Sequence, residues 1–259
     1  MTLRDRLARD GYVILPPDNR VSRWAVAAKE AAKSVLADPT EQAQWLRHGK
    51  TWFVGVDALP NDASGEIGGG ALAGPWDGLI EMPDQLHRAQ LSGVFPGYPR
   101  QDPGESDAAH RFRMTRDAAH LDGLHAEGSD RRRHLREPHA FILGLPLTDA
   151  APGAAPLVVW DGSHHRMRAA MRERLEGIAP GRWGDEDVTD AYTVARRAVF
   201  DTCPRRVLPL LPGQSILVHR LAIHGVAPWM EGAWSDPAGR LVAYFRPHLA
   251  QTEDWLADD

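Results

Sequence analysis

The 259-residue sequence has little of the features that mark secreted, disulfide-stabilised or membrane-bound proteins. Cys203 is its single cysteine, which excludes an intramolecular disulfide, and the first residues lack the apolar core of a secretory signal. No apolar run approaches the roughly 20 residues that are needed to cross a bilayer. We therefore expect a soluble, cytoplasmic protein that has no membrane partner.

An excess of positive charge is also absent. The chain carries 35 acidic and 30 basic side chains, which gives a formal net charge of −5. Because nucleic-acid binding usually needs a basic stripe, we expect no nucleic-acid partner. The densest basic run, residues 131–136, is flanked by Asp130 and Glu137, so we interpret it as a solvated loop. Contact with an anionic substrate tail or with another subunit is the alternative for this run.

The chain does contain enough apolar residues to form one folded domain. A chain of this length can bury a sizeable core, so we expect a single domain over residues 1–259 with helical N-terminal packing segments. Apolar spacing and Gly/Pro positions predict helices near 22–36, 83–94, 165–176 and 188–200, strands at 51–56, 111–116, 140–145 and 157–160, and a loop over 57–78.

The C-terminal part of the chain has the pattern of consecutive strands. Residues 206–219 predict a strand, a Pro-Gly turn and a second strand, and a further apolar run ends at His224. The last long segment is rich in β-forming residues. Four polar side chains fall on one face of it, namely Arg240, Tyr244, Arg246 and His248. A guanidinium on an otherwise apolar strand needs an anionic partner.

One tripeptide carries the most chemical information. In an extended chain His120 and Asp122 point to the same side, while Leu121 between them faces a core. Together with a second histidine such as His224, these groups can cap one face of a ferrous ion and leave positions open for an oxidant and a co-substrate. The tripeptide alone has little weight, because a chain with 12 histidines is expected to contain about one His-x-Asp by chance.

Other histidines are weaker candidates for the same site. His125 and Glu127 form a second His-x-carboxylate pair, but it lies beyond the predicted strand. His164 and His165 follow a Gly-Ser turn and are better explained by a helix start or a loop. His219 is better explained as a hydrogen-bonded core residue. None of these residues enters the predicted ligand set.

Several segments, in their order along the chain, resemble the phytanoyl-CoA dioxygenase family of iron(II)/2-oxoglutarate oxygenases. The resemblance spans nearly the whole chain. The matching segments are Arg9-Asp10-Gly11-Tyr12-Val13-Ile14, His120-Leu121-Asp122-Gly123, Gly162-Ser163-His164, Leu211-Pro212-Gly213-Gln214, His224-Gly225, and Arg240 at the start of the last long strand.

The resemblance implies a mainly β fold with flanking helices, built as a double-stranded β-helix (a cupin-like jelly roll). It implies that His120, Asp122 and His224 are the catalytic iron ligands, and that Arg240 forms a forked pair with the distal carboxylate of 2-oxoglutarate. Iron(II), the co-substrate 2-oxoglutarate and O₂ would then serve to hydroxylate a small organic molecule.

This chain departs from the family pattern at two positions that bear on the co-substrate. The segment between His224 and Arg240 is longer than usual, which keeps Arg246 as an alternative anchor for 2-oxoglutarate. Val226 stands where a small polar residue often helps to hold it. Asp122, in contrast, follows the hydroxylase pattern, because a related halogenase has a small residue in place of this carboxylate.

The sequence leaves three function classes open. The first is the 2-oxoglutarate-dependent hydroxylase; the others are a jelly-roll protein that binds a small molecule without turnover, and a metal-dependent enzyme that does not use 2-oxoglutarate. Joint binding of iron and 2-oxoglutarate distinguishes the first class from the other two. Predicted walls of a substrate pocket are Trp52, Phe53 and Val54, the Gly-rich loop through Trp76, and residues 229–234.

Overall fold

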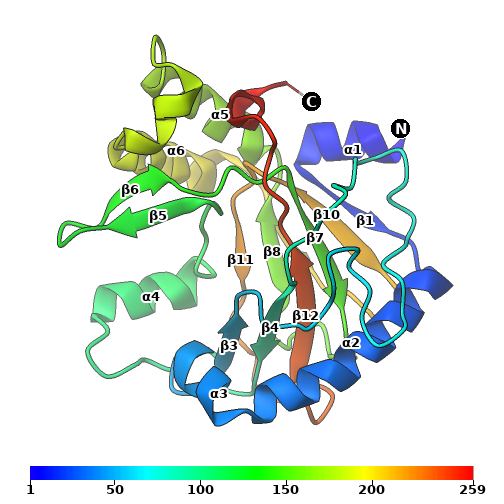
Figure 1. Cartoon of the computed structure of the whole chain (residues 1–259). Coiled ribbons are helices and arrows are strands. Elements are labelled where there is room, and N and C mark those ends of the chain that lie inside the picture. Colours follow the sequence, from blue (N-terminus) through cyan, green and yellow to red (C-terminus); the bar gives the residue numbers. More distant parts are fainter. Residues whose placement is uncertain (259) are drawn as a thin grey trace.

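The structure of the protein is a computed structural model that describes residues 1–258. Helices surround a core of β-strands (Figure 1). The α-helices are α1 (Leu3–Asp10), α2 (Asn19–Ala37), α3 (Pro39–Trp45), α4 (Asp107–Thr115), α5 (Ser163–Arg174) and α6 (Thr189–Thr202). The described residues also form the 3-10 helices η1 (Pro180–Asp185) and η2 (Thr252–Leu256).

The strands are distributed over a large, a small and a two-stranded sheet. The large sheet has the order β1-β10-β7-β12-β4-β3-β2, the small sheet has the order β11-β8-β9, and β5 pairs with β6. Every pairing between these strands is antiparallel. The strands are β1 (Tyr12–Leu15), β2 (Leu46–Arg47), β3 (Trp52–Gly55), β4 (Gln90–Val94), β5 (Leu124–Glu127), β6 (Arg132–Leu135), β7 (Phe141–Pro146), β8 (Leu157–Trp160), β9 (Arg205–Leu208), β10 (Ser215–His219), β11 (His224–Val226) and β12 (Arg240–Phe245).

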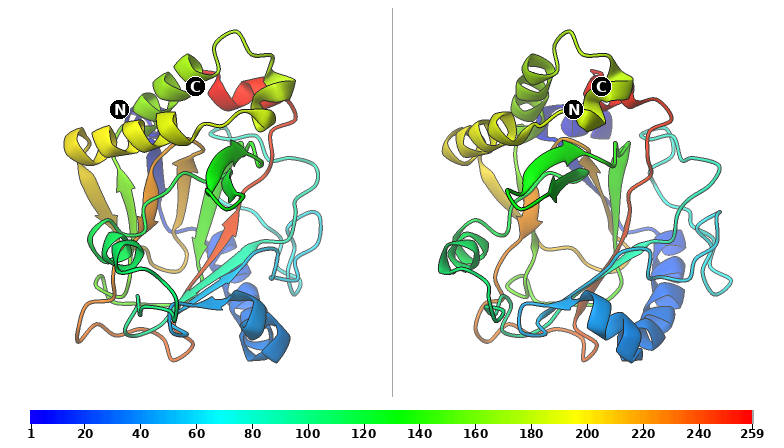
Figure 2. Two further views of the ribbon diagram at one scale, coloured as in Figure 1. Left: turned by 90° about the vertical axis from the view of Figure 1, so that its left-hand side faces the viewer. Right: turned by 60° about the vertical axis from the view of Figure 1, so that its left-hand side comes forward.

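The path of the chain between the two main sheets is that of a jelly roll. Strand β7 lies in the large sheet, β8 and β9 lie in the small one, β10 returns to the large sheet, β11 to the small one and β12 to the large one. Figure 2 shows the two sheets facing each other around the interior of the barrel. The predicted fold class, mainly β with flanking helices around a jelly roll, is confirmed.

The alternation of side chains along the strands divides the core into layers. One face of the large sheet packs under α2, where the fully buried Trp24 contacts Phe245. The other face contributes Ile142 and Ile216, which pack against Leu157 of the small sheet. Helices α5 and α6 cover the outer face of the small sheet. The barrel interior therefore lies between two sheets whose outer faces are covered by helices.

The predicted helix at 83–94 is wrong, because residues 90–94 form strand β4, an interior strand of the large sheet. Its apolar residues satisfy a helical spacing and a strand spacing equally well over so short a run. Pairing with β3 on one side and β12 on the other decides between them. Tertiary pairing thus overrides the local preference.

The predicted strand at 111–116 is also wrong, since this segment belongs to helix α4. The alternation of charged and apolar residues there is too short to exclude a helix. Ser106 caps the helix, because its Oγ accepts a hydrogen bond from the Ala109 amide at 3.2 Å. Phe112 then packs against Phe200 of α6, with ring centroids 6.1 Å apart. The remaining predicted helices and strands are present, with ends shifted by a few residues.

Within residues 1–258, no helix combines the length and the apolar character that a bilayer-spanning helix needs.

Candidate metal centre

Two segments that are distant in sequence bring the predicted ligands together. Residues 119–121 lie beside β11, and a pair of backbone hydrogen bonds at His120 joins them to it. The His120 amide donates to the His224 carbonyl at 2.9 Å, and the His224 amide donates to the His120 carbonyl at 3.1 Å. Leu121 is only 2% exposed and packs in the core under α5 and α6, as its alternation with His120 and Asp122 predicts.

A glycine makes this close approach of two backbones possible. A Cβ atom at Gly225 would lie 2.2 Å from the carbonyl oxygen of Asp117 and 3.1 Å from the Cα of Ala119. Both of those contacts are backbone atoms of the segment that leads into His120, so neither can move aside without moving the ligand. The glycine after His224 therefore has a steric role in setting the distance between the two histidines.

The three side chains converge on one point. His120 Nε2 lies 3.0 Å from Asp122 Oδ1, and His224 Nε2 lies 3.8 Å from the same oxygen. One nitrogen from each histidine and one carboxylate oxygen all lie within 4.8 Å of one another. Among residues 1–258, this is the one group of three or more His, Cys, Asp or Glu side chains with that property. The two imidazoles and one carboxylate match the donor set that suits ferrous iron.

Backbone carbonyls orient both imidazoles. Nδ1 of His120 lies 3.0 Å from the Ala118 carbonyl oxygen, and Nδ1 of His224 lies 2.9 Å from the Ala222 carbonyl oxygen. A carbonyl can only accept, so each Nδ1 carries a proton and donates it, and Nε2 is the nitrogen of each ring that is left to bind a metal. Such hydrogen bonds from the outer nitrogen are typical of metal-binding histidines.

Charge states at the centre also fit a metal ligand set. Burial lowers the pKa of His224, which keeps the imidazole neutral near pH 7. Burial alone would raise the pKa of Asp122, but His224, His120 and Arg246 outweigh it and hold the pKa well below its usual range. Arg246 Nη1 lies 3.4 Å from the other carboxylate oxygen, Asp122 Oδ2. The site thus combines an ionised carboxylate with a neutral imidazole.

The ligands line a cavity of about 180 Å³ inside the barrel. Its other walls are mostly apolar, and they come from β3, β7, β8 and β11. Gln90 and Ser92 of β4 and Tyr244 of β12 add polar groups. A cavity with few polar groups on apolar walls is typical of a site for a small molecule.

The two arginines that were predicted as alternatives have different surroundings. Arg246 lines the cavity beside Asp122. Arg240 is only 6% exposed and lies four residues before Tyr244 on β12. Burial raises the pKa of Tyr244, and Arg240 is close enough to oppose that rise. Nη1 of Arg240 has no hydrogen-bond partner among residues 1–258. A buried guanidinium with an unused donor can be stabilised by an anion, which fits a carboxylate of a co-substrate.

Tyr244 therefore connects the cavity to Arg240, and no sequence pattern singled out this role. Its ring lies against Gly144, where a Cβ atom would stand 2.8 Å from the ring edge. The signal available in the sequence was its position on the same strand face as Arg240 and Arg246. Val226, the departure from the family pattern, lines the same cavity.

The weaker histidine candidates lie elsewhere. His125 Nε2 contacts Glu137 at 3.3 Å, whereas Glu127 pairs with Arg136, so the second His-x-carboxylate pair does not converge. His164 is buried at the start of α5, where its Nε2 lies 2.9 Å from the Ala8 carbonyl oxygen. His219 is a core residue whose Nδ1 accepts from the Leu221 amide at 2.9 Å.

The basic run at 131–136 is the β5–β6 hairpin rather than an irregular loop. Arg132 pairs with Asp187 and Asp190, and Arg136 pairs with Glu127. Because these guanidiniums have carboxylate partners within the chain, the run is a poor candidate for an anionic substrate tail.

The predicted pocket walls are present in part. Trp52 and Val54 line the cavity, while Phe53 between them faces α2 in the core. Trp76 is buried in that same core and does not line the cavity. Trp229 packs against the buried cluster that contains Val226 and does not line the cavity.

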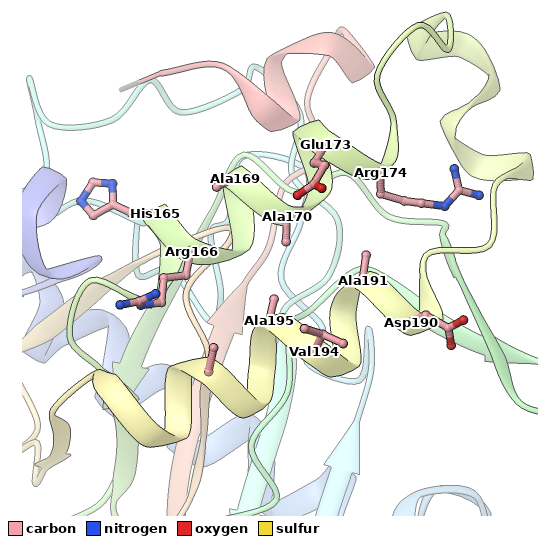
Figure 3. Close-up of a pocket in the computed structure, with 11 residues that line it drawn as sticks. His165, Arg166, Ala169, Ala170, Glu173, Arg174, Asp190, Ala191, Val194 and Ala195 are labelled. Carbon is pink, nitrogen blue, oxygen red and sulfur yellow. The ribbon is translucent and has the colours of Figure 1, made fainter.

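A larger cavity, of about 800 Å³, lies between α5 and α6 and shares no residue with the cavity at the ligands (Figure 3). Alanines such as Ala169, Ala170 and Ala195 leave the space between the two helices. Although this groove is larger, no histidines or acids converge in it. It therefore lacks the donor groups that a metal-dependent active site needs.

Ser163 is a positioning residue that the metal motif itself does not contain. It is fully buried, and its Oγ accepts a hydrogen bond from the Ile223 amide at 2.9 Å, next to His224. Ser163→Ala leaves that amide without a partner and should lower the free energy of unfolding by about 1–3 kcal/mol. Urea unfolding measures the change, with Ser129→Ala in the exposed hairpin turn as the control. Equal stability of Ser163→Ala and wild type would contradict this role.

Comparison with known proteins yields distant similarities only. Neither a family model nor a curated protein sequence matches the chain. Among solved structures, the chain is similar to the non-heme α-ketoglutarate-dependent carbocyclase SnoK from nogalamycin biosynthesis, with 14% identity over 97% of this chain and 87% of that chain and a TM-score of 0.48. It is similar to the epimerase SnoN in complex with Fe³⁺, α-ketoglutarate and nogalamycin RO, with 17% identity, coverage of 94% and 81%, and a TM-score of 0.46. It is also similar to EctD from S. alaskensis with 2-oxoglutarate and 5-hydroxyectoine, with 17% identity, coverage of 94% and 73%, and a TM-score of 0.45. At these identities and TM-scores, a functional assignment has to rest on the residues of this chain.

Proposed function

We propose that the chain is an iron(II)- and 2-oxoglutarate-dependent dioxygenase that hydroxylates a small organic molecule, as a single-domain member of the phytanoyl-CoA dioxygenase family. The observation that carries the proposal is the convergence of His120, Asp122 and His224 on one point, with Nε2 of both imidazoles left to bind a metal. No other group of that kind exists in residues 1–258.

The three ligands would hold ferrous iron on one face and leave the opposite face accessible from the cavity. When bound, iron and 2-oxoglutarate supply the oxidising power, with O₂ as oxidant and succinate and carbon dioxide as the products of the co-substrate. The aspartate at position 122 favours hydroxylation over halogenation, because it occupies the position that a halide would need.

The other residues of the site position the reactants. Arg246 faces Asp122 Oδ2 and helps to keep this carboxylate ionised, which leaves Oδ1 directed at the histidines. Arg240 would bind the distal carboxylate of 2-oxoglutarate through its unused donor, and Tyr244 would hold the guanidinium in place. The apolar side chains of Trp52 and Leu157 limit the access of water to the reacting groups.

An anaerobic titration of the metal-free protein with ferrous iron and then with 2-oxoglutarate tests the proposal. We expect a saturable visible charge-transfer band that appears only when both are present. A protein that is folded by circular dichroism but gives no band would contradict the proposal. Retention of small-molecule binding would then point to a binding protein, and activity that does not depend on 2-oxoglutarate would point to a different metal-dependent enzyme.

A further inference from the structure

A second cavity, of about 330 Å³, adjoins the one that contains the metal ligands. Val56 and Arg246 line both cavities, so the two spaces are adjacent at these side chains. We call the second cavity the vestibule and define it by its polar wall, which consists of Asp57, Gln85, His87, Glu137, His139 and His248. A molecule bound in the vestibule would lie next to the face of the metal centre that Arg246 borders.

The vestibule contains an ionised, partly accessible carboxylate. Glu137 Oε2 lies 3.3 Å from His139 Nε2 and 3.3 Å from His125 Nε2. Its interaction with His139, which outweighs partial burial, lowers the pKa of Glu137 to about 2. The Glu137 side chain is 30% exposed, so it can still contact a ligand. Asp57 is a second carboxylate on the same wall and is more exposed.

The partners of these carboxylates within the vestibule are histidines. His87 Nδ1 lies 2.9 Å from Asp57 Oδ1, and Nε2 of the same ring accepts a hydrogen bond from the Arg246 amide at 3.2 Å. Burial, together with His139, lowers the pKa of His248. His139 is 3% exposed, its Nδ1 lies 3.0 Å from the Arg246 carbonyl, and its buried Nε2 has no well-aligned hydrogen bond within residues 1–258.

The one guanidinium on the vestibule wall is already engaged. Arg246 directs Nη1 at Asp122, on the side of the metal centre. The nearby basic hairpin contributes no free charge through Arg132 or Arg136, because both pair with carboxylates. Asp57 and Glu137 thus face the vestibule with histidine partners and with no guanidinium or ammonium group bonded to them. Such a wall attracts positive charge and repels anions.

We infer that the vestibule is the substrate site, and that the substrate is a small molecule with a positively charged nitrogen, which Glu137 and Asp57 bind. This inference rests on the proposed function, since it places the substrate beside the proposed iron. The cationic group lies in the vestibule, while the carbon to be oxidised extends past Arg246 toward His120 and His224. The same charges disfavour acyl thioesters that carry anionic phosphates.

Three probes of equal chain length and different charge test the inference, namely 1,4-diaminobutane, 1,4-butanediol and succinate. Their binding to the metal-free full chain is measured by ligand-observed nuclear magnetic resonance. We expect diaminobutane to bind most tightly and to lose affinity as salt is raised. Glu137→Gln should weaken its binding about fivefold. The control is Glu127→Gln, which changes a carboxylate on β5 outside the vestibule and should have no effect.

Several results would overturn the inference. The inference fails if butanediol binds as tightly as the diamine, or if no probe binds measurably. It fails also if the diamine binds wild type and Glu137→Gln with equal affinity. Finally, it fails if succinate binds more tightly than the diamine at a site for which 2-oxoglutarate does not compete. Cobalt(II) titration of the same samples reports the metal centre separately. Loss of cobalt binding with intact diamine binding would reject the proposed function alone, and the converse would reject the vestibule alone.

Discussion

Asp122→Ala should lower the affinity for ferrous iron on the order of a hundredfold or more and abolish turnover coupled to succinate formation. The substitution removes the one carboxylate of the ligand group and leaves two neutral imidazoles to hold a dication. Iron affinity is measured by anaerobic titration, and succinate is measured in the same preparation. Both quantities should fall together, because the co-substrate chelates the metal that Asp122 would hold.

The chain offers a matched control in the second His-x-carboxylate pair. Glu127→Ala removes a carboxylate that lies on the β5–β6 hairpin and pairs with Arg136, away from the ligands. It should leave iron affinity unchanged. Because Asp122 is a buried partner of Arg246, the fold of Asp122→Ala is checked by near-ultraviolet circular dichroism. Unchanged iron affinity in folded Asp122→Ala would refute the ligand set.

Arg240→Ala should raise the KM for 2-oxoglutarate about 100-fold, with little change in iron affinity. Arg240 is buried and has an unused donor, so a carboxylate placed there would form a desolvated, charge-assisted pair. Steady-state kinetics at varied 2-oxoglutarate give the KM, and the ferrous titration gives the metal affinity.

Arg246→Ala is the matched variant, since both arginines project from the same segment of chain. Arg246 contacts Asp122 Oδ2, so its loss should weaken iron binding and leave the KM for 2-oxoglutarate nearly unchanged once iron is saturating. The opposite pattern, with the KM raised in Arg246→Ala and unchanged in Arg240→Ala, would assign the co-substrate to Arg246.

The ligand positions could be predicted from sequence because they depend on local rules and on order along the chain. The alternation of His120, Leu121 and Asp122 determines which side chains share a face, and Leu121 is buried as that alternation requires. His224 follows from its place at the end of an apolar run. The convergence of the two segments depends on the jelly roll, which the family resemblance predicted and local patterns did not.

The vestibule could not be predicted in the same way. Its polar wall combines residues 57, 85–87, 137–139 and 248, which come from four separate parts of the chain. His87 falls in a segment that the sequence wrongly predicts as a helix, and Glu137 flanks the run that is predicted as a loop, so no pattern assigns them to a common surface. Strand β4 shows the same limit, because its neighbours β3 and β12 determine its conformation more than its own residues do.

The reciprocal backbone hydrogen bonds between His120 and His224 have a consequence for metal uptake. They belong to the antiparallel pairing of the barrel, so the spacing of the two imidazoles is set by the sheet and does not require an ion. Binding iron therefore orders few rotatable bonds and loses little conformational entropy. A zinc finger folds only around its metal, whereas here a metal would enter a site whose backbone is already assembled. We therefore expect the protein to lose bound iron and regain it without unfolding.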